Sequence, residues 1–133
     1  MFKWANVPYP DARAGLRRAN QQLQQLKEDQ QEGIPLASWF LPAVDKVFVT
    51  QARTDRQIAA LRCIEAIRLH VAAHDGRLPR QLSEITEVPV PRDPVTGEPF
   101  EYRIDGDRAT LIARPPAGDS QPPPLHYELT FKR

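Results

Sequence analysis

The sequence LPAVDKVFVTQARTDRQIAALRCIEAIRLHVAAH occupies residues 41–74 and predicts the longest element of the chain, a helix that stops at Asp75-Gly76. When the residues of this helix are placed at about 100° intervals, one narrow apolar stripe consists of Ala60, Ile64, Ile67 and Val71. Ile58 and Leu69 lie almost opposite that stripe. A helix with apolar residues on two sides is expected to pack between a sheet and a second partner.

A shorter helix is predicted before the long one, over residues 11–33, and an extended arm at residues 1–10 precedes it. Asp11 suits the N-cap of this helix and Gly33 suits its stop. Its apolar residues repeat in a narrow heptad-like seam formed by Ala12, Leu16, Ala19, Leu23 and Leu26. Because the connection that follows is short, the seam predicts a helical hairpin with the long helix. A helix of another subunit is the alternative partner.

The long helix is expected to span residues 38–75, with Ser38 as its cap or Pro42 in its first turn. The region 76–133 cannot be helical for long, because most of the 14 prolines of the chain fall there. Alternating apolar and polar residues predict strands at Pro99–Ile104, Ala109–Ala113 and residues 125–131. The expected fold is therefore α+β, with a helical hairpin whose long helix packs on an antiparallel sheet of three or more strands.

Length and charge limit the classes of function. The 133 residues are expected to form a single domain over 1–133, with one modest core. The 18 basic and 17 acidic side chains nearly cancel, which gives no field that would steer the protein to nucleic acid. No signal peptide and no apolar run long enough for membrane insertion are visible. The default expectation for its location is therefore cytoplasmic.

The segment DPVTGEPFEYRIDGD at residues 93–107, which follows a helix containing AALRCIEAIRLHVAAHDGRLP, resembles the soluble part of type II secretion pseudopilins. The matching positions are Asp93, Pro94, Gly97, Pro99, Phe100 and Tyr102. The chain is similar, more closely still, to a C-terminal domain that recurs in large uncharacterised planctomycete proteins. The resemblance covers about Gln57 to Ile112. It implies a fold in which a long helix packs on an antiparallel sheet, in a bacterial protein.

The same positions have physical roles that do not depend on the resemblance. The prolines each fix one backbone φ angle, Gly97 permits the positive φ of a turn, and Asp93 can accept hydrogen bonds from turn amides. Pseudopilins also carry an unbroken apolar helix that anchors them in the membrane. The corresponding region of this chain has five charged residues, Asp45, Lys46, Arg53, Asp55 and Arg56. The expectation is therefore a pseudopilin-like fold without the anchor.

The long helix also carries candidate metal ligands. His70 and His74 are one turn apart, and Cys63 lies seven residues before His70, so all three could face one zinc or other transition-metal ion. Cys63 and His70 are, however, about 10 Å apart by helical rise, which is too far for one ion with ideal geometry. The alternative is a cysteine that acts as a small apolar residue and two histidines favoured by the helix dipole. No cofactor is expected.

The expected function is a non-catalytic interaction or assembly module, either whole or as the C-terminal part of a larger protein. No arrangement of residues typical of an active site occurs in the sequence, so an enzyme is not expected. The partner is a protein or a second copy of the chain. The candidate interface consists of Leu16, Ala19, Leu23, Leu26, Ile58 and Leu69. A metal-binding domain that uses His70 and His74 is the alternative.

Overall fold

The computed structural model describes residues 35–118 and 120–131, together with Asp11, Gln25 and residues 14–15, 17–19 and 21–22; side chains are described from Pro42 onward in the long helix. The chain divides into two compact units, Met1–Ala52 and Arg53–Arg133. The boundary falls inside the long helix, α2 (Pro35–Ala73). The single domain predicted over 1–133 stays a prediction.

In the first unit, the described residues between Asp11 and Gln25 are helical, as predicted for residues 11–33. Ala19 is among them and is half-buried. The other seam residues of the predicted interface, Leu16, Leu23 and Leu26, lie outside the described residues, as does the arm at residues 1–10. The helical hairpin therefore stays a prediction.

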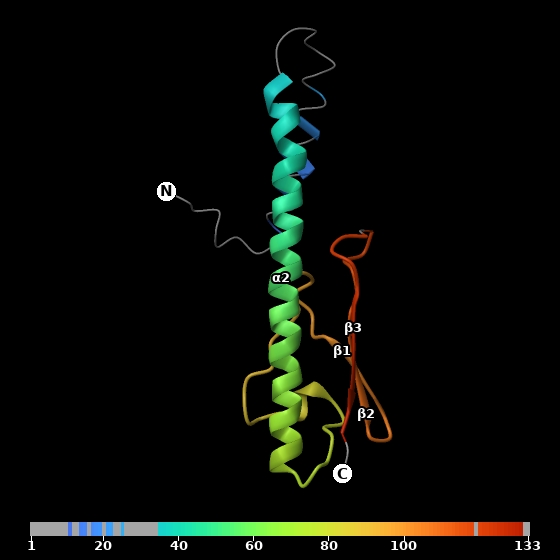
Figure 1. Ribbon diagram of the computed structural model, residues 1–133. Helices are drawn as coiled ribbons and strands as arrows, with labels where there is room; N and C mark the ends of the chain where they lie inside the picture. The colour runs from blue at the N-terminus through green and yellow to red at the C-terminus, as the bar shows by residue number, and fades with distance from the viewer. Residues whose placement is uncertain are drawn as a thin grey trace. The chain divides into compact units, whose positions relative to one another are not determined.

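Helix α2 begins at Pro35 and ends at Ala73, rather than spanning residues 38–75 as predicted. Helix α2 runs on as one helix (Figure 1), and Pro42, which was the alternative mark of its first turn, lies inside it. A proline there removes one hydrogen bond to the preceding turn, but the rest of the helix continues past it. The expected stop at Asp75-Gly76 is confirmed, because these residues have φ angles of 53° and 81°. The amide of Gly76 donates to the Val71 carbonyl at 2.9 Å, which closes the helix end.

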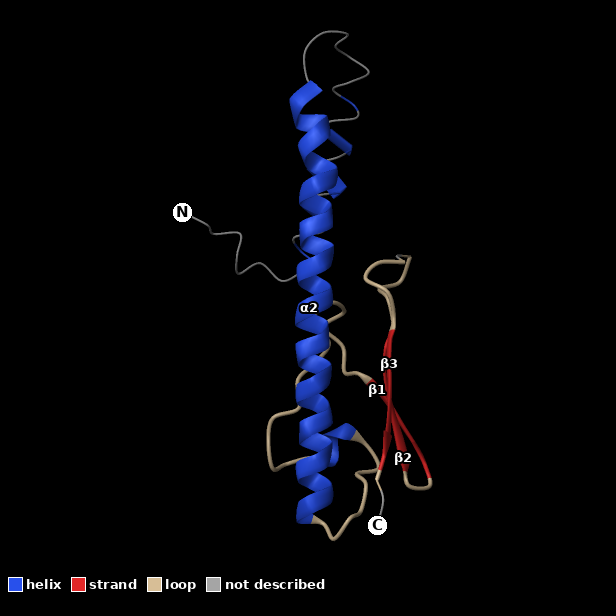
Figure 2. Ribbon diagram, viewed as in Figure 1, coloured by secondary structure: helices blue, strands red, loops and turns tan. Residues whose placement is uncertain are grey.

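The second unit contains a three-stranded antiparallel sheet with the order β1-β2-β3 (Figure 2). The strands are β1 (Glu101–Asp105), β2 (Arg108–Ala113) and β3 (Leu125–Thr130). Asp105 pairs with Arg108 across a two-residue turn in which Gly106 has a φ of 63°. A short 3-10 helix, η2 (Leu82–Glu84), lies between α2 and the sheet in the sequence. The long helix and antiparallel sheet of the predicted α+β fold are thus confirmed.

One core joins the second half of α2 to one face of the sheet. The helix contributes Ala59, Ala60, Cys63, Ile64, Ala66 and Ile67, and the other segments contribute Ile85, Phe100, Leu111 and Ala113. Tyr102, Leu125, Tyr127, Leu129 and Phe131 pack against this cluster, so the alternating residues of β1 and β3 face inward as predicted. Among the described residues, no helix is long and apolar enough to cross a membrane.

Candidate functional site

Among the described residues of the second unit, the most deeply buried charge is Arg56, a residue of α2 whose side chain is fully buried. Its guanidinium group donates to both carboxylate oxygens of Asp93, with the shortest contact, from Nη2 to Oδ2, at 2.6 Å. It also donates to the carbonyl oxygens of Arg114 at 2.5 Å and Pro123 at 3.4 Å. One side chain therefore connects α2 to the segments that precede β1, follow β2 and precede β3.

Asp93 begins the turn that the sequence motif predicted. Its Oδ1 accepts a hydrogen bond from the amide of Val95 at 2.9 Å, and its carbonyl accepts one from the amide of Gly97 at 2.7 Å. Gly97 has a φ of 75°, a conformation that favours glycine. Of the other motif residues, Phe100 enters the core, whereas Pro94 and Pro99 are exposed. The motif therefore presents a carboxylate to Arg56 and an aromatic ring to the core.

Two histidines and a carboxylate come together at the C-terminal end of α2. The Nδ1 atom of His70 lies 3.3 Å from Oε2 of Glu87, and Nδ1 of His74 lies 3.3 Å from Oε1 of the same carboxylate. Nδ1 of His74 also lies 2.9 Å from the carbonyl oxygen of His70. The two imidazole rings are stacked, with centroids 3.9 Å apart. We call this group the His70–His74–Glu87 cluster.

The surroundings of Glu87 lower the pKa of its carboxyl group. The backbone amide of Glu87 itself, followed by His70 and the amide of Thr86, lowers the pKa of the Glu87 carboxyl below its ordinary value. Cys63 does not belong to the cluster. Its side chain is fully buried in the core, and burial raises the pKa of its thiol to about 11. The structure therefore places Cys63 as the small apolar residue that was the alternative interpretation.

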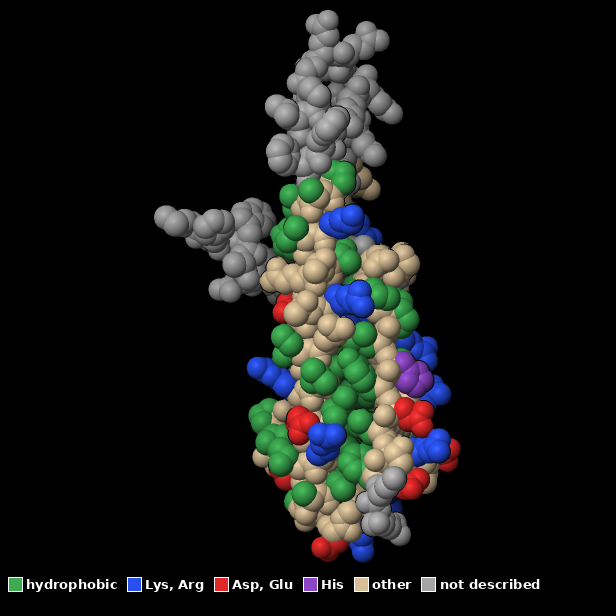
Figure 3. Space-filling model, in the orientation of Figure 1, with side chains coloured by type: hydrophobic (Ala, Val, Ile, Leu, Met, Phe, Trp, Pro, Cys, Tyr) green, Lys and Arg blue, Asp and Glu red, His purple; other side chains and the backbone are tan. Residues whose placement is uncertain are grey.

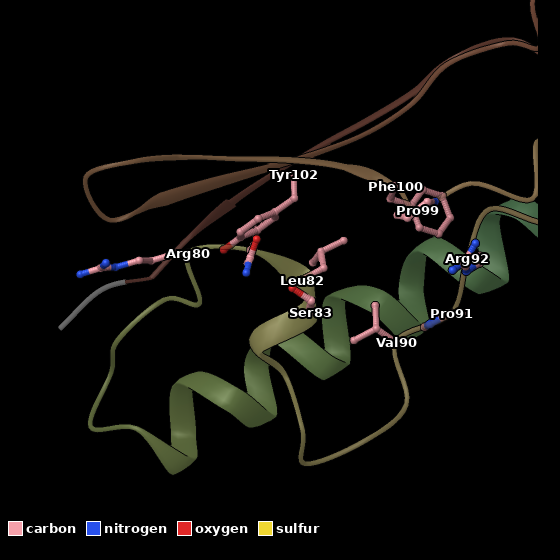
Figure 4. A pocket seen from close by; sticks show the side chains of 10 residues that line it. Arg80, Leu82, Ser83, Val90, Pro91, Arg92, Pro99, Phe100 and Tyr102 are labelled. Atoms are coloured by element: carbon pink, nitrogen blue, oxygen red, sulfur yellow. The ribbon is translucent and has the colours of Figure 1, made fainter.

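A shallow groove lies between the sheet and the segment that carries η2. It has a volume of about 390 Å³ and is lined by ten residues, among them Arg80, Leu82, Phe100 and Tyr102. Tyr102 extends from β1 toward the turn that bears Leu82 and Ser83 (Figure 4). The Tyr102 hydroxyl is buried and has no hydrogen-bond partner among the described residues, and burial raises its pKa to about 12.

Removing this hydroxyl should stabilise the protein. A buried polar group without a partner is costly, so we expect Tyr102→Phe to raise the free energy of unfolding by about 1 kcal/mol. Urea denaturation followed by circular dichroism measures the change. Tyr127→Phe on β3 is the control and should give no such gain. A Tyr102→Phe variant that is less stable than the parent would mean that the hydroxyl is hydrogen-bonded in solution.

Large apolar side chains are exposed on the side of α2 that faces away from the core. Ile58, Leu61 and Leu69 expose 46%, 53% and 48% of their surface. With Arg62 and Glu65 between them, these residues form what we call the outer face. Hydrophobic side chains reach the surface beside charged ones in the space-filling view (Figure 3). Single exposed apolar residues are ordinary, but several on one side of a helix are typical of a contact surface.

The predicted site residues thus fall into three places. Ile58 and Leu69 lie on the outer face, His70 and His74 lie in the cluster, and the motif residues build the turn and the core. Sequence reasoning missed Glu87, Arg56 and Leu61. Only Leu61 had a usable signal, since it lies one turn from Ile58 on the same side of the helix. Comparisons with protein-family models, with curated proteins and with solved structures found no match.

Proposed function

We propose that this chain is a non-catalytic interaction module that binds a second copy of itself through the outer face of α2. The observation that carries the proposal is the exposure of about half the surface of Ile58, Leu61 and Leu69. Burial of these side chains against a like surface would remove apolar area from water.

The order of residues on the outer face favours a second copy as the partner. Ile58 and Leu69 are equidistant from the midpoint between Cys63 and Ile64, and so are Arg62 and Glu65. Two antiparallel copies of α2 related by a two-fold axis at that midpoint would place Ile58 against Leu69 of the second copy. The same arrangement places Arg62 beside Glu65 of the second copy. Such self-complementarity is what a two-fold interface requires.

Within one chain, Glu65 already accepts a hydrogen bond from Arg68 at 2.9 Å. Both side chains are largely exposed, so this contact contributes little to stability and leaves the carboxylate accessible. Glu65 can therefore be shared between Arg68 of its own chain and Arg62 of the second copy. The apolar area offered is small, and the dimer is expected to be weak and concentration-dependent.

A charge exchange tests this arrangement. Arg62→Glu and Glu65→Arg should each weaken dimerisation, because each places like charges opposite one another across the two-fold axis. The double variant restores opposite charges and should recover dimerisation. Sedimentation velocity over a concentration series measures the equilibrium, and Arg77→Glu, at an exposed position beyond α2, is the control. Equal dimerisation in all variants, or no recovery in the double variant, would contradict the antiparallel pairing.

The likeness to the soluble part of pseudopilins, and to the C-terminal domain of planctomycete proteins, is also kept as a proposal. It is supported by the turn that begins at Asp93 and by a long helix packed on an antiparallel sheet. The helical hairpin between residues 11–33 and the long helix is likewise a proposal, and the heptad-like seam of residues 11–33 supports it. A module of this kind would contribute contacts to an assembly rather than catalyse a reaction.

A further inference from the structure

We propose that the His70–His74–Glu87 cluster is a binding site for a divalent transition-metal ion of the zinc class. The candidate ligand atoms of the three side chains all lie within 4.8 Å of one another. Two imidazoles and one carboxylate are a ligand set that zinc uses in proteins, with a fourth position left to water or another group. The site does not depend on the dimer proposed above.

The separations between the ligand atoms are close to those around a zinc ion. Ligand atoms about 2.1 Å from a tetrahedral zinc ion are separated from one another by about 3.4 Å. Each histidine Nδ1 lies 3.3 Å from an oxygen of Glu87. The carboxylate already contacts Nδ1 of both rings, so it is in place to share an ion with them.

The two histidines of the cluster differ in burial, so the His70 ring is held in place whereas the His74 ring can move. The His70 side chain is 8% exposed and that of Glu87 is 22% exposed, whereas the His74 side chain is 48% exposed. An ion must lie near the plane of each imidazole that binds it, and the stacked rings, inclined by only 19°, do not share such a point. His74 is the exposed member, so it is the ring that turns about its side-chain torsions to complete the site.

The electrostatics also favour a cation. The Glu87 carboxylate is an anionic ligand, and the cluster lies at the C-terminal end of α2, where the helix dipole is negative. An ion held here would tie the end of α2 to the segment that carries Glu87, which runs beside the helix (Figure 1).

Titration of the full chain, purified without a histidine tag, with Co²⁺ followed by Zn²⁺ tests the proposal. We expect one equivalent of Co²⁺ to bind with visible bands of a low-symmetry, four-coordinate ion, and Zn²⁺ to displace it. Thiolate-to-cobalt charge-transfer bands should be absent, because Cys63 lies in the core. His74→Ala and Glu87→Gln should each weaken binding by more than about tenfold. Each removes a ligand of the ion, and loss of a residue that only supports a ligand already costs about tenfold.

His126→Ala is the matched control, since it removes an exposed histidine of β3 and should leave the affinity unchanged. Circular dichroism of each variant verifies the fold, and His74 is exposed enough for its replacement to be tolerated. No saturable binding, or binding that is equal in the parent, His74→Ala and Glu87→Gln, would overturn the proposal. Thiolate bands would assign the ion to Cys63 instead and would equally overturn it.

Discussion

Replacing Asp93 by alanine is expected to lower the free energy of unfolding by about 3–5 kcal/mol, because it leaves the Arg56 guanidinium buried without its anion. Arg56 is fully buried and Asp93 is only 3% exposed, so water cannot replace the lost partner. A loss of this size is a large part of the total stability of an ordinary domain. Urea denaturation followed by circular dichroism measures it, and the variant should be largely unfolded in mild denaturant.

A double-mutant cycle separates the ion pair from the other roles of Asp93. Asp93→Asn keeps an oxygen for the amide of Val95 but removes the charge, and Arg56→Met removes the guanidinium while keeping apolar volume. The double variant should be less destabilised than the sum of the two single variants, because neither buried charge is then left alone. Arg108→Met, which breaks an exposed ion pair with Glu128, is the control and should cost less than about 1 kcal/mol. Strict additivity would contradict the proposed coupling.

The second large effect concerns the outer face of α2. Leu69→Asp and Ile58→Asp should each abolish dimerisation at concentrations where the parent chain is dimeric, because each places a carboxylate against an apolar side chain of the second copy. Neither change should unfold the chain, since both residues are about half exposed. Sedimentation velocity gives the dimer fraction, and circular dichroism verifies the fold.

The control for this pair of variants is Ile104→Asp. Ile104 is also a large exposed apolar residue, with 37% of its surface accessible, but it lies on β1 rather than on α2. The dimer fraction of this variant should equal that of the parent. If all three aspartate variants lost dimerisation equally, the contact would not be specific to the outer face.

Local signals accounted for much of the fold. The end of α2 follows from Asp75-Gly76, and the inward faces of the strands follow from the alternation of residues such as Phe100, Tyr102 and Leu111. The start of α2 was predicted at residue 38 because Ser38 suits an N-cap, with Pro42 in the first turn as the alternative, whereas the helix begins at Pro35. A proline early in a helix does not identify its first residue.

The candidate sites were harder to predict from the sequence, because the residues that form each site are far apart along the chain. Arg56 was used only as one of the charges that argue against a membrane anchor, and its burial depends on Asp93, which lies 37 residues away. Glu87 lies 17 residues from His70 in a segment without helical or strand periodicity. Only the folded chain brings these groups together. The outer face was partly predicted, because Ile58 and Leu69 are related by the helical repeat alone.

The most direct test of the central claim is the molar mass of the unmodified chain in solution, measured by sedimentation equilibrium over a wide concentration range. Self-association through the outer face predicts a rise from the mass of one chain at low concentration to that of two chains at high concentration. The rise should stop at two, because a two-fold interface is closed. A mass that stays at one chain throughout the range, or one that grows beyond two chains, would contradict the account.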